Sequence, residues 1–321
     1  MILAAGFGAR LGPLTQHRPK PMLPVCGTPL VRWVLLWLRS QGIREFVINL
    51  HHLGHQIEAE LGDGSTLGVA IAYSHEEGQI LGTGGGLRQA RPLLDDGRDV
   101  PIVVVNGKVL LELDLEHVLA FHREHHAEAT MVLRPDAEME RWGQPLHVEG
   151  GGRVVSMLGE VVAGEGTGEP LMFSGVHLFQ PCFLDRIPSA GEQCVIRTAY
   201  MELLREGEGL AGFVTRKYWW DHSTAERYLE GVCNVLDGRV ALPYAEHPLR
   251  GVDARAKVAE GATIEGPSWI GPLAEVGAGA HVGPHVQLGR GARVEPGRRL
   301  RRAIVWDGAR VTRDLQDEVL A

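Results

Sequence analysis

Residues 2–30 read ILAAGFGARLGPLTQHRPKPMLPVCGTPL. Residues 2–5 form a short apolar run that predicts a buried strand. Residues 6–10, GFGAR, follow as a loop in which the glycines let backbone amides approach a ligand closely. Thr28 as N-cap and Pro29 in the first helical position predict that a helix begins only there. The loop between strand and helix is therefore long, and loops of such length usually have a function.

This loop is basic, although the chain as a whole is acidic. The sequence has a net charge of -8, yet residues 1–44 contain no Asp or Glu. The basic residues of this segment are Arg10, Arg18, Lys20, Arg32, Arg39 and Arg44. A strand that leads into a glycine-rich basic loop offers amide donors and fixed positive charge, which together suit a polyphosphate.

Two familiar phosphate-binding loops do not fit this stretch. A Walker loop needs Gly-Lys-Ser/Thr after four spaced residues, which the stretch lacks. A dinucleotide fingerprint needs a third glycine at position 11, where the chain has Leu11. It also needs an acid about twenty residues further on, whereas the first acid in the chain is Glu45.

The stretch closely resembles the signature of sugar-1-phosphate nucleotidyltransferases, approximately LAAGxGxRLxPLTxxxPKPMLPVxGxPL. The resemblance implies that the loop wraps a nucleoside triphosphate, and that Arg10 and Lys20 are catalytic residues that hold the phosphates. Strands and helices are expected to alternate through Asn106, which predicts a doubly wound, mostly parallel sheet. The resemblance implies the same Rossmann-like α/β fold. The nucleotide-binding residues implied in this way are Leu3, Ala5, Gly6, Gly8, Arg10, Gly82, Thr83, Gly84, Gly85 and Asn106.

A second glycine-rich segment, residues 81–87 (LGTGGGL), is similar to the family loop that contacts the base and the sugar. It follows two predicted strands, residues 45–50 and 69–73, and opens a predicted helix. Packing alone does not account for four glycines in five residues, so we expect them to let a flat ring lie on the backbone. Thr83 is expected to cap the helix.

The strand expected at residues 101–106 ends in Val105-Asn106-Gly107-Lys108, where the family has V-N-G-D. The resemblance implies that this Asp and Asp221 hold the catalytic magnesium. A protonated lysine has no lone pair for a metal, and one unit charge at 4 Å is worth about 4 kcal/mol at an effective dielectric of 20. We therefore expect a weakened Mg²⁺ site at Asp221. The alternative is that Lys108 points into solvent and Asp114 reaches in, although Asp114 also fits a helix cap.

The sugar-binding half follows, with strands expected at residues 128–134 and 153–158. By resemblance, Gly85, Glu160, Ser174 and Gly175 would bind the sugar. Residues 218–225, YWWDHSTA, align with the family's YWxDIGTP, so Asp221 is kept while Ser and Ala replace the usual Gly and Pro. Thr224 is expected to cap the next helix.

The C-terminal part repeats with a period of six. The repeated aliphatic residues are Val252, Val258, Ile264, Ile270, Val276, Val282, Leu288, Val294 and Leu300. Such hexads predict a short left-handed parallel β-helix of about three coils. The predicted domains are residues 1–236 (nucleotidyltransferase), 237–249 (linker) and 250–321 (β-helix). A short solenoid leaves its ends uncovered, so a homo-oligomer through the β-helix is expected, with a related subunit as the alternative partner.

Length and composition set the class of protein. The 321 residues, 44% hydrophobic and 22% charged, predict a globular protein. No apolar run has membrane-spanning length, so we expect a cytoplasmic protein without a membrane partner. The acidic balance also argues against a nucleic-acid partner. His51, His52 and His55 could indicate a metal site, but no carboxylate or Cys falls in step with them.

Among the family, the hexapeptide tail most resembles bacterial mannose-1-phosphate guanylyltransferases, which join GTP and a sugar-1-phosphate. Two alternatives stay open within the family. The first is a silent regulatory paralogue that binds a nucleotide sugar, because Lys108 replaces the metal-binding Asp. The second is a muramate-phosphate or other sugar-phosphate uridylyltransferase, which residues 63–74 and 174–179 resemble. An acyltransferase with His281 or His285 as base is a further hypothesis for the β-helix.

Overall fold

The structure is a computed structural model that describes residues 1–162 and 169–321. The chain folds into two compact units, each built from separate segments. The first unit comprises Met1–Gly6, Leu38–Gly107 and Leu113–Trp219, and the second comprises Phe7–Trp37, Lys108–Glu112 and Trp220–Ala321. The domain boundaries expected at residues 236 and 250 stay predictions. None of the helices in the described part of the chain is long and apolar enough to cross a membrane.

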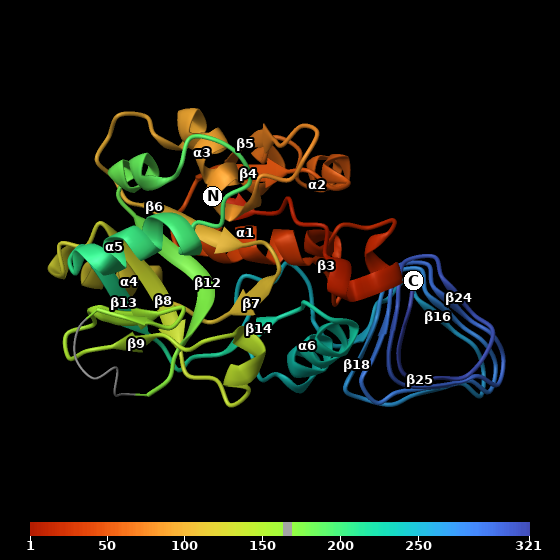
Figure 1. The fold of residues 1–321 in the computed structure, drawn as a ribbon. Coiled ribbons are helices and arrows are strands. Elements are labelled where there is room, and N and C mark those ends of the chain that lie inside the picture. The colour runs from red at the N-terminus through yellow and green to blue at the C-terminus, as the bar shows by residue number, and fades with distance from the viewer. Residues whose placement is uncertain (163–168) are drawn as a thin grey trace. The chain divides into compact units, whose positions relative to one another are not determined.

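A seven-stranded sheet forms the first unit, in the order β13-β8-β12-β6-β1-β4-β5. Its strands are β1 (Ile2–Leu3), β4 (Glu45–Leu50), β5 (Ala70–His75), β6 (Ile102–Asn106), β8 (Ala129–Arg134), β12 (Met172–Phe179) and β13 (Leu210–Val214). All neighbouring strands pair in parallel except β12, which is antiparallel to both β6 and β8 (Figure 1). The predicted mostly parallel, Rossmann-like sheet is therefore confirmed.

The neighbouring strands β1 and β6 are apolar apart from Asn106, which is typical of strands covered on both faces. Val104, Met131 and Phe179 are fully buried in the core of this unit. Its helices are α2 (Gly54–Leu61), α3 (Gly82–Leu94), α4 (Leu115–Glu124) and α5 (Met201–Glu206). A small antiparallel sheet joins β9 (His147–Val148), β10 (Val154–Met157) and β11 (Glu160–Val161).

The N-terminal signature loop, residues 7–27, belongs to the second unit and ends in a tight turn. β2 (Pro24–Val25) pairs with β3 (Thr28–Pro29) across Cys26 and Gly27, whose φ angles are 48° and 81°. Helix α1 (Leu30–Ser40) begins only after this turn. The prediction that Thr28 caps the helix was therefore wrong, because Thr28 lies in a strand and its hydroxyl bonds to His247 Nε2 at 3.0 Å.

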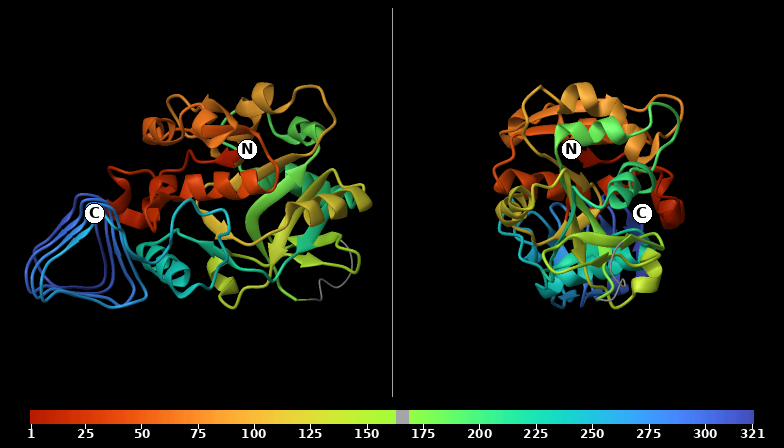
Figure 2. Two further views of the ribbon diagram at one scale, coloured as in Figure 1. Left: turned by 180° about the vertical axis from the view of Figure 1, so that it is seen from behind. Right: turned by 60° about the vertical axis from the view of Figure 1, so that its left-hand side comes forward.

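The β-helix occupies the C-terminal part of the second unit. Its strands are β15 (Gly251–Val252), β16 (Lys257–Val258), β17 (Thr263–Ile264), β18 (Ser268–Ile270), β19 (Glu275–Val276), β20 (His281–Val282), β21 (Val286–Leu288), β22 (Arg293–Val294), β23 (Arg299–Val305), β24 (Arg310–Val311) and β25 (Leu315–Leu320). Figure 2 shows these coils as nested triangles. Ile270 pairs in parallel with Val252 and Leu288, eighteen residues to either side, so three hexads make one coil. The predicted parallel β-helix is confirmed.

The β-helix has a further coil beyond the three expected. Val294 pairs with Val311 and Leu300 pairs with Leu315, so the spacing falls from eighteen residues to seventeen and fifteen. Val311 and Leu315 are nevertheless buried in the same core. The hexad period therefore stops at Leu300, while the stacking of aliphatic side chains continues.

Candidate functional site

The lysine that replaces the expected carboxylate forms an ion pair with the carboxylate that remains. Lys108 Nζ lies 2.7 Å from Asp221 Oδ2. Lys108 directly precedes β7 (Val109–Leu111), Asp221 ends β14 (Trp219–Asp221), and these strands form a two-stranded sheet. The Asp114 alternative is wrong, because Asp114 caps α4 by accepting a hydrogen bond from Glu116 N at 2.9 Å.

Burial and the neighbouring positive charges shift the pKa of Asp221 in opposite directions. The Asp221 side chain is only 3% exposed, and that of Lys108 is 26% exposed. Burial alone would raise the pKa of Asp221, but the adjacent Lys108 ammonium outweighs it and holds the pKa below its ordinary value. Lys20 lowers this pKa further. Asp221 is therefore ionised at neutral pH and paired with a cation.

The backbone on both sides of this ion pair is fixed. Arg227 Nε donates to Asp221 O at 3.0 Å, and its guanidinium stacks on Trp220 at 4.1 Å. Arg227 lies in α6 (Ala225–Asp237), which Thr224 caps as predicted. Burial lowers the pKa of His222 to about 4, so its ring is neutral and Nδ1 can donate to Lys108 O at 3.1 Å. These contacts hold Asp221 and Lys108 in place through their main chains.

Lys20 and Arg10 complete a cluster of cations in the second unit. Lys20 is 8% exposed, and burial, with Lys108 and Arg10 adding to it, lowers its pKa to about 8. Asp221 opposes this shift, and Lys20 remains protonated at neutral pH. Arg10 is exposed in the 3₁₀ turn Ala9–Thr15. Gly8, at φ 71°, allows close packing, since a Cβ there would lie 3.2 Å from Lys20 Cβ.

The residues of this cluster do not fit a two-carboxylate metal site. Asp221 Oδ1 is buried, has no hydrogen-bond partner among the residues that the structure describes, and could be one metal ligand. Its other oxygen, however, is held by an ammonium group, which repels a divalent cation and supplies no lone pair. Nowhere in the described ranges do three His, Cys, Asp or Glu side chains gather as a ligand set, and this includes His51, His52 and His55. We therefore derive no chemical step through a metal ion.

The first unit holds the end of β1 through a buried polar network. Ala4 N donates to Asn49 Oδ1 at 2.9 Å, and Asn49 Nδ2 donates to Glu76 Oε1 at 2.7 Å. Glu76 Oε2 accepts from Leu81 N at 2.8 Å. The network joins β1, β4 and the start of α3, next to the predicted nucleotide-binding residues Leu3, Ala5 and Gly6. Sequence reasoning missed Asn49 and Glu76, although a polar residue inside the apolar strand β4 was a signal.

The glycines of α3 contact protein atoms on several sides. A Cβ at Gly82 or Gly84 would lie 2.5 or 3.2 Å from Gln193 O, and one at Gly86 would lie 2.6 Å from Glu76 Oε1. Packing therefore does account for these glycines, contrary to our expectation. The predicted Thr83 cap was also wrong, because α3 begins at Gly82 and the Thr83 hydroxyl accepts from Val195 N at 3.0 Å. Nucleotide contacts at Gly82, Thr83, Gly84 and Gly85 stay predictions.

Asn106 and Gly175 lie against each other on neighbouring strands of the first unit. Gly175 has φ 80°, and a Cβ there would lie 2.1 Å from Asn106 Nδ2. Ser174 is buried, and its hydroxyl donates to Val132 O at 2.8 Å. Glu160 is exposed on β11 and forms an ion pair with Arg205 at 2.5 Å. The roles of these residues in nucleotide or sugar binding stay predictions.

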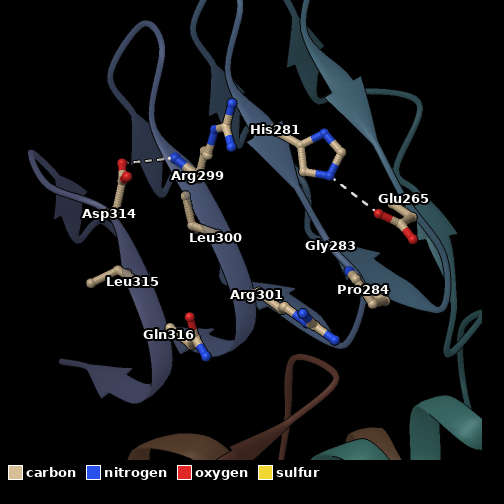
Figure 3. A pocket seen from close by; sticks show the side chains of 10 residues that line it. All are labelled: Glu265, His281, Gly283, Pro284, Arg299, Leu300, Arg301, Asp314, Leu315 and Gln316. Atoms are coloured by element: carbon tan, nitrogen blue, oxygen red, sulfur yellow. Dashed lines mark hydrogen bonds and ion pairs between the residues drawn. The ribbon is translucent and has the colours of Figure 1, made fainter.

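A separate cavity of about 490 Å³ lies on the β-helix (Figure 3). Within it, His281 Nε2 lies 3.1 Å from Glu265 Oε2. His285, the other histidine of the acyltransferase hypothesis, lies outside this cavity and bonds to Asp237 Oδ1 at 2.6 Å. A carboxylate beside an imidazole occurs both in general-base sites and in ordinary surface ion pairs, so the acyltransferase role of His281 or His285 stays a hypothesis.

Comparison with known proteins shows a family and several relatives that match most of the chain. Residues 1–238 match the family described as nucleotidyl transferase. The mannose-1-phosphate guanylyltransferase of Mycobacterium tuberculosis is 33% identical over 97% of this chain and 80% of the relative. The N-acetylmuramate alpha-1-phosphate uridylyltransferase of Neisseria meningitidis serogroup B is 41% identical over 72% of this chain and 95% of the relative.

Solved structures show the same fold. A putative glucose-1-phosphate thymidylyltransferase from Bacillus anthracis superposes with a TM-score of 0.60. The two proteins are 23% identical, and the match covers 75% of this chain and 95% of the other. Because the family match spans most of the sequence and the first relative covers almost all of it, the chain belongs to the nucleotidyl transferase family of enzymes.

Proposed function

We propose that the chain is a sugar-1-phosphate nucleotidyltransferase of the mannose-1-phosphate guanylyltransferase type. The observation that carries this proposal is the cationic cluster of Arg10, Lys20 and Lys108 at the signature loop. A phosphate oxygen of the sugar-1-phosphate attacks the α-phosphorus of the nucleoside triphosphate. The bond from that phosphorus to the bridging oxygen breaks, and pyrophosphate leaves with the electron pair.

Such a displacement depends on positioning and charge neutralisation more than on proton transfer. Arg10 and Lys20 would hold the phosphate oxygens, and Lys108 would add a third positive charge as negative charge moves to the leaving group. The choice of GTP and mannose-1-phosphate follows the Mycobacterium tuberculosis relative, which matches this chain through both the sheet and the β-helix region.

A second candidate is a protein that binds a nucleotide sugar without turning it over. The observation that favours it is the Lys108–Asp221 ion pair at 2.7 Å, which sits where the resemblance implies a metal. A third candidate is a uridylyltransferase for a muramate-1-phosphate, favoured by the 41% identity to the Neisseria meningitidis protein.

We extend the proposal to assembly and location. Val252 and Val258, on the first coil of the β-helix, are 46% and 41% exposed, which favours a homo-oligomer that covers this end. A catalytic domain of residues 1–236 and a β-helix of residues 250–321, joined by a linker, remain part of the proposal. So does a cytoplasmic location.

Pyrophosphate release with Mg²⁺ present, from a panel of nucleoside triphosphates and sugar-1-phosphates, tests these candidates. The first predicts release with GTP and mannose-1-phosphate, and the third predicts release with UTP and N-acetylmuramate-1-phosphate. The second predicts no release from any pair, but thermal stabilisation by a nucleotide sugar. Lys20→Ala is the control, because it removes a cation of the signature loop and should abolish release. A folded protein that neither releases pyrophosphate nor binds any nucleotide contradicts all three.

A further inference from the structure

Lys108 is held in place at its main-chain carbonyl group and at its side-chain ammonium group. Its carbonyl oxygen accepts two hydrogen bonds from His222, from N at 3.3 Å and from Nδ1 at 3.1 Å. Its ammonium group is held 2.7 Å from Asp221 Oδ2, and the side chain still has 26% of its surface exposed. Part of the conformational entropy of this long side chain is thus already lost before any ligand arrives. A partly exposed, pre-positioned ammonium group can attract a phosphate oxygen without further rearrangement.

The charges of the cluster support such a role. Arg10, Lys20 and Lys108, with Asp221, carry three positive charges and one negative, so the group has two net positive charges. With Asp in place of Lys108, the same four side chains would be neutral. One bound divalent cation would then bring the total back to two. With Lys108, these four side chains therefore carry two net positive charges without a metal ion. A site with Asp at position 108 would reach the same net charge only after it bound a divalent cation.

We propose that Lys108 replaces the divalent cation in this site, so that the protein binds the diphosphate group of a nucleotide without a metal ion. This inference rests on the proposed function, because it takes a nucleotide as the ligand. An ammonium group donates up to three hydrogen bonds as a compact point charge, which suits the oxygens of a diphosphate. The ligand class is a nucleoside triphosphate or a nucleotide sugar, which share that group.

Equilibrium binding measured by calorimetry tests the proposal. The probes are GTP, UTP, GDP-mannose and UDP-N-acetylglucosamine, each titrated in excess EDTA and in excess Mg²⁺. For the unaltered protein, the Kd of the preferred probe should differ by less than about threefold between the two conditions, because the cation is part of the chain. The triphosphates and the nucleotide sugars are titrated separately, so their Kd values show which of the two ligand classes the site prefers.

Three variants make the test specific. Lys108→Asp should lose at least about tenfold in affinity in EDTA and regain it with Mg²⁺, because the site then depends on a metal. Lys108→Met keeps the length of the side chain without its charge, and should lose affinity in both conditions. Lys257→Ala removes an exposed lysine of β16 and should change neither the Kd in EDTA nor the Kd in Mg²⁺. Unfolding temperatures measured in parallel show whether each variant is folded.

Two results would overturn the proposal while leaving the proposed function intact. One is binding by the unaltered protein that weakens more than about tenfold in EDTA. The other is unchanged binding by folded Lys108→Met in EDTA. If no probe binds the unaltered protein in either condition, both the proposed function and this inference fail.

Discussion

Gln287 of the β-helix accepts a hydrogen bond from Cys26 N at 2.7 Å, although the two residues are 261 positions apart. The Nε2 of the same side chain donates to Pro24 O at 3.1 Å. Gln287 is fully buried, so both contacts are shielded from water. The turn that ends the signature loop is therefore held by the β-helix and does not depend on its local sequence alone.

Gln287→Ala should destabilise the protein and weaken nucleotide binding together. The change leaves the buried Cys26 N–H without an acceptor, which costs about 1–3 kcal/mol. Denaturant unfolding followed by fluorescence, and calorimetric titration of a nucleotide, measure the two effects. Gln316→Ala, at an exposed glutamine of β25, is the matched control. Its free energy of unfolding should lie within about 0.5 kcal/mol of that of the unaltered protein. Equal stability of the two variants would contradict the role assigned to Gln287.

Gly175→Ala should displace the Asn106 carboxamide. The new Cβ would lie 2.1 Å from Asn106 Nδ2, and φ at this position is 80°, so we expect a loss of about 2 kcal/mol or more. Adding Asn106→Ala removes the clash and should restore part of the stability. If Asn106 binds nucleotide, the double variant should regain stability without regaining affinity. Recovery of both would show that Asn106 has no part in binding.

Nucleotide affinity should fall as the pH rises through the pKa of Lys20. Burial lowers this pKa to about 8 in the folded protein, against an ordinary value of 10.5. Between these values the unfolded chain holds more protons than the folded chain, so Lys20 contributes to a rise in stability with pH. The attraction for phosphate declines over the same window, because the folded protein loses the charge. Titrations at intervals from about pH 7 to about pH 9 should show weaker binding, and Lys20→Arg should flatten the profile. If the affinity of Lys20→Arg falls with pH as steeply as that of the unaltered protein, Lys20 is not the cause of the pH dependence.

Asp221→Asn should keep nucleotide binding but lower stability. The Lys108 ammonium would lose its partner, and breaking such a half-buried pair costs about 1–3 kcal/mol after allowance for its partial exposure. The positive charge of the cluster would rise, so affinity for a nucleotide in EDTA should hold or increase. Thermal unfolding and calorimetry measure the two effects. A large loss of affinity in the folded variant would show that the carboxylate itself contacts the ligand or a metal.

The sequence predicted the elements whose pattern is local. The alternation of strands and helices predicted the sheet, and β4 has the bounds that its apolar run predicted, Glu45–Leu50. The period of six predicted the stacking of the β-helix. It missed the last coil because the spacing shortens after Leu300.

Contacts between distant residues could not be predicted in this way. The helix caps expected at Thr28 and Thr83 failed because each hydroxyl bonds to a residue far along the chain, His247 and Val195. The network of Asn49 and Glu76 also depends on tertiary structure. The family resemblance points to Lys108 and Asp221, but the ion pair between them depends on the pairing of β7 with β14 in the folded chain.

The most direct test of the central claim, that Lys108 takes the place of the metal, is the number of Mn²⁺ ions bound per chain. Electron paramagnetic resonance of free Mn²⁺, with the preferred nucleotide sugar present, measures this number for the unaltered protein and for Lys108→Asp. We predict that the unaltered protein binds no Mn²⁺ beyond that held by the nucleotide alone, and that Lys108→Asp binds one more ion per chain. One tightly bound Mn²⁺ in the unaltered protein, with no increase in the variant, would contradict the claim.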